Sequence, residues 1–179
     1  MFSRTETDRI TWFSMWFLGA IATFGAAFFP MFYRLIDSRN KHFNREARLE
    51  QQINLWLIKQ GKEAQATACP VDMKAKAWAA SIILIIPAFI ITYYLSRDLQ
   101  AHEQHQDTFL AKAFPERMFM TQTIPIKKYA LITLVTLGVG GIYWLYRVTN
   151  LYNAHFKAQR VVERTIARLM EEKKVAEHM

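Results

Sequence analysis

Histidines recur in this chain at one fixed distance behind a tyrosine. The three pairs are Tyr33 and His42, Tyr93 and His102, and Tyr146 and His155. Imidazole nitrogens bind divalent metals and haem iron, so a shared metal or haem site is one interpretation of the spacing. Three histidines without paired carboxylates form a thin ligand set, however. The alternative, which we favour, is that they are polar residues at a surface or interface.

A second group of metal-binding residue types lies between positions 98 and 107. His102 and His105 are three residues apart, and Asp98, Glu103 and Asp107 lie close to them in the sequence. Such a group is found in divalent-metal surface clusters and, more commonly, on solvated helix faces. We expect the solvated face, and therefore predict no metal and no cofactor.

Three long apolar stretches must position these residues. They cover residues 10–33, 77–96 and 129–146, and none of them contains a charged side chain. About 20 apolar residues cross a bilayer at a rise of about 1.5 Å per residue, so each stretch is long enough for a transmembrane helix. We therefore predict an all-α integral membrane protein with three transmembrane helices.

The distribution of basic residues predicts an orientation for these helices. Lys and Arg number 16 in residues 34–76 and 147–179, against 7 in residues 1–9 and 97–128. The positive-inside rule then predicts a multi-pass protein of the cell membrane with its N-terminus outside and its C-terminus in the cytoplasm. The net charge of +8 would face a bilayer with anionic headgroups, and nucleic acid is not expected as a partner. In this topology His102 lies across the membrane from His42 and His155, which argues against a shared site.

The polar segments on the predicted cytoplasmic side have the periodicity of amphipathic helices. Apolar residues recur at helical spacing over residues 38–59, before Gly61, and again over residues 150–176. The chain thus divides into residues 1–75, with the first span and an amphipathic helix, and residues 76–128, with the second span and an extracytoplasmic loop. Residues 129–179 hold the third span and a C-terminal helix.

An internal repeat relates the first and third of these segments. Residues 18–53 and 131–166 align without a gap at an offset of 113, and 10 of the 36 aligned positions are identical. The repeated unit is a span plus its following helix. Both copies run the same way through the predicted membrane because one span lies between them, which agrees with a count of three spans.

The repeated residues predict two kinds of contact. The repeated residues at the end of each span and in the helix that follows it should contact lipid phosphates or partner subunits. They are Tyr33, Arg34, Asn40, His42 and Phe43 in the first copy, and Tyr146, Arg147, Asn153, His155 and Phe156 in the second. Small residues within the spans should allow close helix packing. They are Gly19, Ala22, Gly25, Ala26, Gly138 and Gly141.

The segment from Thr136 to Arg147 reads T-L-G-V-G-G-I-Y-W-L-Y-R. It resembles the signature T-L-G-x-x-G-I-Y-W-L-Y-R of a family of small prokaryotic multi-span membrane proteins of unknown function. The first repeat copy departs from the signature, since Phe29, Pro30 and Met31 stand where I-Y-W is expected. The resemblance implies a multi-span fold and a membrane location, and it carries no activity or binding residue.

No catalytic constellation is visible in the sequence, and this decides the predicted function. The lone cysteine, Cys69, excludes a multi-cysteine metal site and an internal disulfide framework. We expect a non-catalytic accessory or structural subunit that packs with other membrane subunits in a larger complex. The alternative is a homo-oligomeric membrane scaffold or membrane-shaping protein. A metal- or haem-binding membrane enzyme or carrier is the third hypothesis.

Overall fold

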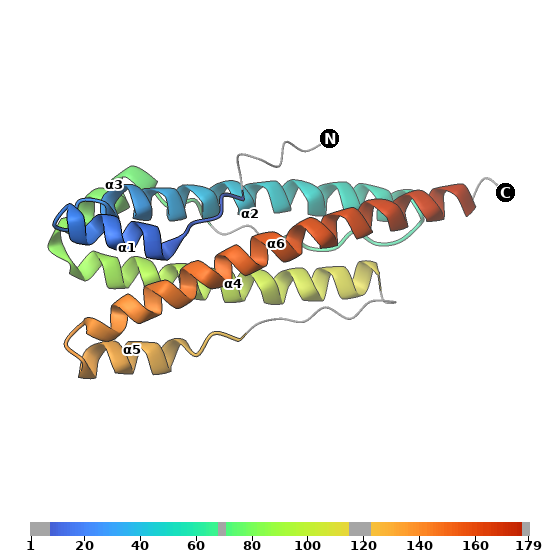
Figure 1. Cartoon of the computed structure of the whole chain (residues 1–179). Coiled ribbons are helices and arrows are strands. Elements are labelled where there is room, and N and C mark those ends of the chain that lie inside the picture. The colour runs from blue at the N-terminus through green and yellow to red at the C-terminus, as the bar shows by residue number, and fades with distance from the viewer. Residues whose placement is uncertain (1–7, 68–70, 115–122, 177–179) are drawn as a thin grey trace.

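The computed structural model describes residues 8–67, 71–114 and 123–176, and the regular secondary structure in this part of the chain consists of helices, without strands. The helices are α1 (Phe13–Ala22), α2 (Phe28–Lys59), α3 (Ala75–Ser81), the short 3-10 helix η1 (Ile82–Leu84), α4 (Ile86–Ala113), α5 (Ile126–Val135) and α6 (Val139–Ala176). The long helices α2, α4 and α6 form the body of the molecule, and the short helices α1, α3 and α5 gather at one end of it (Figure 1).

Each apolar stretch folds back on itself instead of continuing as one helix. Residues 23–27 separate α1 from α2, Ile85 separates η1 from α4, and residues 136–138 separate α5 from α6. In residues 8–67, 71–114 and 123–176, no helix has both the length and the apolar content that crossing a bilayer requires. The predictions of three transmembrane spans, and of a multi-pass location with an outer N-terminus and a cytoplasmic C-terminus, are therefore wrong.

A left-handed backbone conformation makes each of these reversals. The φ angle is +92° at Gly25, +63° at Ile85 and +98° at Gly138. A residue with positive φ directs the chain out of the right-handed helix, and the next helix then starts in a new direction. Three helical hairpins result, each with a short first arm and a long second arm.

The three reversals also show that the middle segment is a third copy of the repeat. In each hairpin the positive-φ residue precedes the repeated tyrosine, Tyr33, Tyr93 or Tyr146, by eight positions. All three long helices therefore start at the same end of the molecule and run in the same direction. The predicted reversal of direction in the middle segment is wrong because that segment contains a complete hairpin of its own.

The helices predicted behind the first and third stretches are the outer parts of the long helices. Helix α2 ends at Lys59, immediately before the turn at Gly61, where φ is +70°. Helix α6 continues to Ala176. Both helices begin before the predicted ends of the apolar stretches, so apolar and amphipathic parts form one continuous rod. Cys69 lies outside the described residues.

Two apolar clusters fill the bundle, one at each end of the long helices. Equivalent positions of the three copies pack together in both. Near the turns these are Met31, Ile91 and Trp144, and in the next layer Leu35, Leu95 and Val148; at the far end they are Ile53, Ala113 and Ile166. The same three-residue layers continue through the middle of the bundle, where the side chains are polar.

Asparagine side chains tie neighbouring hairpins together. The Asn40 side chain on α2 donates to the Met73 carbonyl (2.7 Å) and accepts from the Met73 amide (3.1 Å), just before α3. Asn153 on α6 does the same with Thr11 just before α1, at 2.8 and 2.9 Å. Each amide satisfies one extended residue completely. The repeated asparagines thus fasten the entry of one hairpin to the long helix of another.

The glycines and alanines predicted to mediate packing meet different surroundings. A Cβ atom on Gly141 would overlap the Phe89 ring, and one on Gly138 would lie 3.2 Å from the same ring. A Cβ on Gly19 would lie 3.4 Å from Ala27, an ordinary contact. Gly25 faces open space, and Ala22 and Ala26 are exposed. Among the predicted residues, the closest approach is therefore at the Phe89 ring of α4; Gly140, which was not predicted, packs closely on Ile132 of α5.

This close approach predicts the effect of substitution at Gly141. Gly141→Ala should destabilise the protein by roughly 1–3 kcal/mol, because Phe89 must move to admit the methyl group. Gly19→Ala, also in a helix, should be neutral or slightly stabilising. Urea denaturation of both variants measures the difference. Adding Phe89→Ala should remove most of the Gly141→Ala penalty, and strictly additive effects would contradict the contact.

Candidate metal centre

Three histidines, one from each long helix, meet at the axis of the bundle. His42 on α2, His102 on α4 and His155 on α6 are all buried. Their ring centroids are 5.3 Å (42 to 102), 4.9 Å (42 to 155) and 5.2 Å (102 to 155) apart. One ring nitrogen from each residue lies within 4.8 Å of those of the other two. The prediction that His102 lies far from the other two is wrong, because the hairpin turns put all three residues at one level.

Carboxylates orient two of the three rings. Nδ1 of His42 lies 2.9 Å from Oδ1 of Asp8, and Nδ1 of His155 lies 3.1 Å from Oε1 of Glu103. A carboxylate accepts the Nδ1 proton and leaves the Nε2 lone pair free to act as a ligand. The Nε2 atoms of His42 and His155 lie 3.0 Å apart, which is hydrogen-bond distance. Nε2 of His102 is buried and has no hydrogen-bond partner among the described residues.

Aromatic rings enclose the cluster. Phe43 packs against His102 with ring centroids 4.4 Å apart, and the Phe156 centroid lies 4.9 Å from that of His42. Both phenylalanines are 2% exposed. This apolar surrounding disfavours the protonated imidazolium: burial lowers the pKa of His42 to about 4 and lowers that of His102 well below its ordinary value. The rings of His42 and His102 are therefore neutral at pH 7, the form that binds metals.

An ion-pair network surrounds Asp8. Arg45 lies 2.7 Å from the second oxygen of Asp8 and 2.8 Å from Glu163 on α6. Burial acts to raise the pKa of Asp8, but the hydrogen bond from His42 and the charge of Arg45 outweigh it, and the pKa is lowered. Asp8 is thus held as a carboxylate next to the imidazole it orients.

The layer one turn further along contains three equivalent polar residues. The Gln106 amide donates to Glu46 at 3.0 Å and to Gln159 at 2.8 Å. Burial, together with the nearby charge of Glu163, raises the pKa of Glu46 to about 8. Oε1 of Glu46 and Nε2 of Gln159 are buried without hydrogen-bond partners among the described residues. This layer covers one side of the histidine cluster, and two of its polar atoms have hydrogen-bonding capacity that is not used.

On the other side of the histidines, a buried ion pair crosses the axis. Nη2 of Arg39 lies 2.6 Å from Oδ2 of Asp98, and its guanidinium also lies over the Phe43 ring. Tyr152, at the position equivalent to Arg39, donates to the Leu95 carbonyl at 3.1 Å, and burial raises its pKa. The histidine cluster therefore lies between two polar layers.

The residues predicted to contact lipid or partners divide into two groups. Tyr33 and Tyr146 are each 39% exposed. Arg34 donates to the Ile10 carbonyl at 3.2 Å, and Arg147 is exposed near Tyr129. The others in the set turn inward: Asn40, His42, Phe43, Asn153, His155 and Phe156. The predicted contact of these inward residues with lipid or partners is replaced by contact with one another and with neighbouring hairpins.

The second metal-type group of the sequence does not come together. Asp98 pairs with Arg39, and His105 lies 3.1 Å from Glu50 on α2. His102 faces the axis instead. These residues lie close together on α4 but point to different neighbours. The expected solvated face is wrong for Asp98 and His102, because both are buried.

Sequence reasoning missed the partners that make the histidines a site. Glu103 is adjacent to His102 in the chain but orients His155, and Asp8 precedes the first apolar stretch. The signal that could have found the cluster was the tyrosine-to-histidine spacing in the middle segment, which marks a third repeat copy. The same spacing also places Gln106 level with Glu46 and Gln159.

Comparison with protein-family models, with curated proteins and with solved structures finds no match to this chain. The class of protein is therefore defined by its own fold and site: a helical protein of three parallel hairpins around a buried trihistidine cluster.

The raised pKa of Glu46 predicts how stability depends on pH. Between pH 4.5, its ordinary value, and about 8, the folded protein holds a proton that the unfolded chain releases. The contribution of Glu46 to stability should therefore fall as pH rises through this window, with a limiting slope on the order of 1.4 kcal/mol per pH unit. Below pH 6.5 the lowered pKa values of His42 and His102 act in the opposite direction, so the fall should be seen between pH 6.5 and 8. Glu46→Gln should remove the fall between pH 6.5 and 8 and raise stability at pH 8.

Urea denaturation of metal-free protein at pH 5, 6.5 and 8 measures this. The exposed residue Glu63 provides the control, and Glu63→Gln should leave the profile unchanged. An unaltered profile in Glu46→Gln would show that Glu46 is already ionised in the folded protein.

Proposed function

We propose that this chain is a non-catalytic structural protein whose three hairpins are held together at their axis by one divalent transition metal, with Zn²⁺ as the best candidate. The observation that carries the proposal is the convergence of His42, His102 and His155, each from a different hairpin, on one buried point. A metal bound there joins the three repeat copies directly.

The donor distances suit a small metal ion. Zinc binds histidine nitrogen at 2.0–2.1 Å, so two ligands of a tetrahedral site lie roughly 3.3 Å apart. The nitrogens here lie within 4.8 Å of one another, and the Nε2 atoms of His42 and His155 are 3.0 Å apart. Adjustments of side-chain torsions bring all three to ligand distance. Haem is a poorer fit, because Phe43 and Phe156 occupy the space next to the rings.

The carboxylates beside Nδ1 of His42 and of His155 are a second argument for a bound metal. Metal-binding histidines commonly donate their other ring proton to a carboxylate. Asp8 does this for His42 and Glu103 for His155. The unpartnered Nε2 of His102 completes the set, since a buried polar nitrogen without a partner is costly unless something binds it.

The charge of the interior also favours a cation. Among the described residues the buried acidic side chains are Asp8, Glu46, Glu50 and Asp98, and the buried basic ones are Arg39 and Arg45. A divalent ion offsets this excess of acidic groups, and without one some of the carboxyls must take up protons.

The aromatic enclosure, which keeps substrates from the cluster, supports a structural rather than a catalytic role.

Zinc titration of chelator-treated protein tests the proposal. One equivalent should bind, and at free zinc of about 100 times Kd the stabilisation should be about 2.7 kcal/mol, which raises Tm by roughly 5–10 °C. Co²⁺ in place of zinc should give the visible absorption of a tetrahedral site. His102→Gln should abolish the absorption, and Glu103→Gln should weaken binding roughly 10–100-fold.

The matched control is His105, a histidine on the same helix that pairs with Glu50. His105→Gln should retain full cobalt absorption and the zinc-induced rise in Tm. Equal losses in His102→Gln and His105→Gln, or no binding by the unaltered protein, would refute the metal centre.

A further inference from the structure

The end of the molecule that carries the three turns presents large apolar side chains to its surroundings. At the three equivalent turn positions, Phe24, Leu84 and Leu137 are 101%, 70% and 96% exposed. Phe24 and Leu137 also have positive φ, a conformation that costs energy for residues other than glycine and asparagine. An apolar side chain at a strained and exposed turn does not stabilise the folded chain, so these residues indicate contact with something else.

The threonine hydroxyl in each of two turns is satisfied within the turn itself. The Thr23 hydroxyl donates to the Gly19 carbonyl at 2.7 Å and accepts from the Ala27 amide at 3.0 Å. Its equivalent, Thr136, donates to Ile132 at 2.7 Å and accepts from Gly140 at 2.7 Å. Exposed turns in water do not need such internal partners, because solvent supplies them. Turns placed in hydrocarbon do need them.

The depth of the hairpins corresponds to half a bilayer. Helices α1 and α5 each contain 10 residues, a length of about 15 Å. The hydrocarbon core of a bilayer is about 30 Å thick, so one leaflet contributes about 15 Å. A hairpin of this depth fits into one leaflet and turns back before the midplane.

The charges behind the turns have one sign. Residues 9–36, 74–97 and 123–149 contain no acidic side chain, and their basic residues are Arg9, Arg34, Lys74, Lys76, Arg97, Lys127, Lys128 and Arg147. The equivalent tyrosines Tyr33, Tyr93 and Tyr146 are about two-fifths exposed at the same end. Apolar turns followed by tyrosines and then by basic residues reproduce the order of environments in an anionic leaflet, from acyl chains to headgroups.

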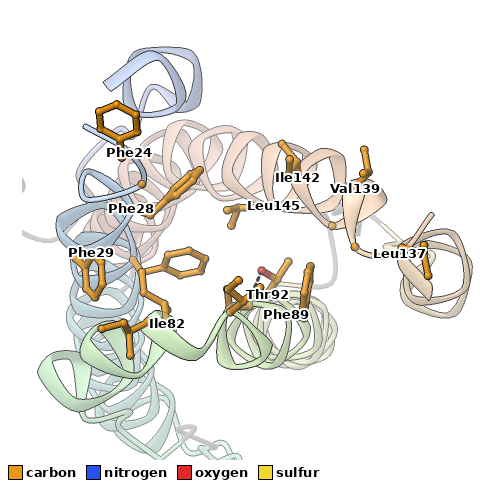
Figure 2. Close-up of a pocket in the computed structure, with 17 residues that line it drawn as sticks. Phe24, Phe28, Phe29, Ile82, Phe89, Thr92, Leu137, Val139, Ile142 and Leu145 are labelled. Carbon is orange, nitrogen blue, oxygen red and sulfur yellow. Dashed lines mark hydrogen bonds between the residues drawn. The ribbon is translucent and has the colours of Figure 1, made fainter. Parts of the chain in front are cut away.

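An apolar hollow lies between the turns. It has a volume of about 630 Å³, and its lining includes Phe24, Phe28, Phe89 and Leu137. Figure 2 shows Phe28, Phe89 and Leu145 directed toward the space between the hairpins. Water in this hollow would face almost entirely apolar walls, whereas the end of an acyl chain would be well accommodated.

We propose that the three hairpin turns dock together into one leaflet of an anionic lipid bilayer, without crossing it, and that the basic residues behind them bind the headgroups. The turns and their charges carry this inference, which is independent of the metal centre. A second copy of this chain, meeting the first turn to turn, is the competing occupant.

Vesicle flotation tests the docking. The unaltered protein should float with vesicles of phosphatidylcholine and phosphatidylglycerol, and less with phosphatidylcholine alone. Phe24→Asn combined with Leu137→Asn should reduce partitioning at least roughly tenfold, because it removes two apolar side chains while asparagine tolerates positive φ. Lys127→Gln with Lys128→Gln should weaken binding to anionic vesicles and lower its salt dependence.

Two controls keep the outcomes distinct. Val161, 63% exposed on the far half of α6, is the matched apolar control, and Val161→Gln should float normally. His102→Gln should also float normally, which separates failure of the metal site from failure of docking. Circular dichroism establishes that each variant is folded. Two results would overturn the proposal. The unaltered protein could form a dimer that the Phe24→Asn, Leu137→Asn variant does not form, and bind no vesicles, which would assign the turns to contact with a second copy. Alternatively, all variants could float equally well.

Discussion

The left-handed residue at the tip of each hairpin is the constraint on which the rest of the molecule depends. Gly25, Ile85 and Gly138 send the chain back along its own path, and three long helices consequently start at one end and run in parallel. Because the spacing from turn to helix is the same in each copy, equivalent residues reach the same depth. The trihistidine layer and the layers on either side of it follow from this register alone.

The register also explains why the copies differ where they do. Three identical charges at one axial level would repel one another in a medium of low dielectric constant. Arg39 is accordingly matched by Leu99 and Tyr152, and Glu46 by Gln106 and Gln159. Histidine can be neutral, so it can stand in all three copies without such repulsion. The same residue type therefore occurs in all three copies in the histidine layer, where the side chain does not have to be charged.

Chemical character changes along the molecule in a single direction. Exposed apolar turns at one end are followed by basic residues, and the buried acidic groups lie beyond them, in the middle of the bundle. The apolar layer of Met31, Ile91 and Trp144 separates the turn end from the buried ion pairs. This separation lets the two ends of the long helices meet different environments without exposing the polar interior to either.

The amino-acid sequence alone establishes the helical class, the end of α2 before Gly61, the repeat linking residues 18–53 with 131–166, and the recurrence of histidine nine residues after tyrosine. These depend on local periodicity and composition, which are readable from the chain. The direction of the helices was not readable, because a 24-residue apolar run has the same composition whether it forms one span or two arms of a hairpin. Only the backbone at Gly25, Ile85 and Gly138 distinguishes the two, and Ile85 has no residue-type signal for positive φ. The site depended on that distinction: alternating spans would place His102 far from His42 and His155, whereas parallel hairpins bring all three to one axis, and Asp8 and Glu103 reach the rings only through the folded tertiary structure.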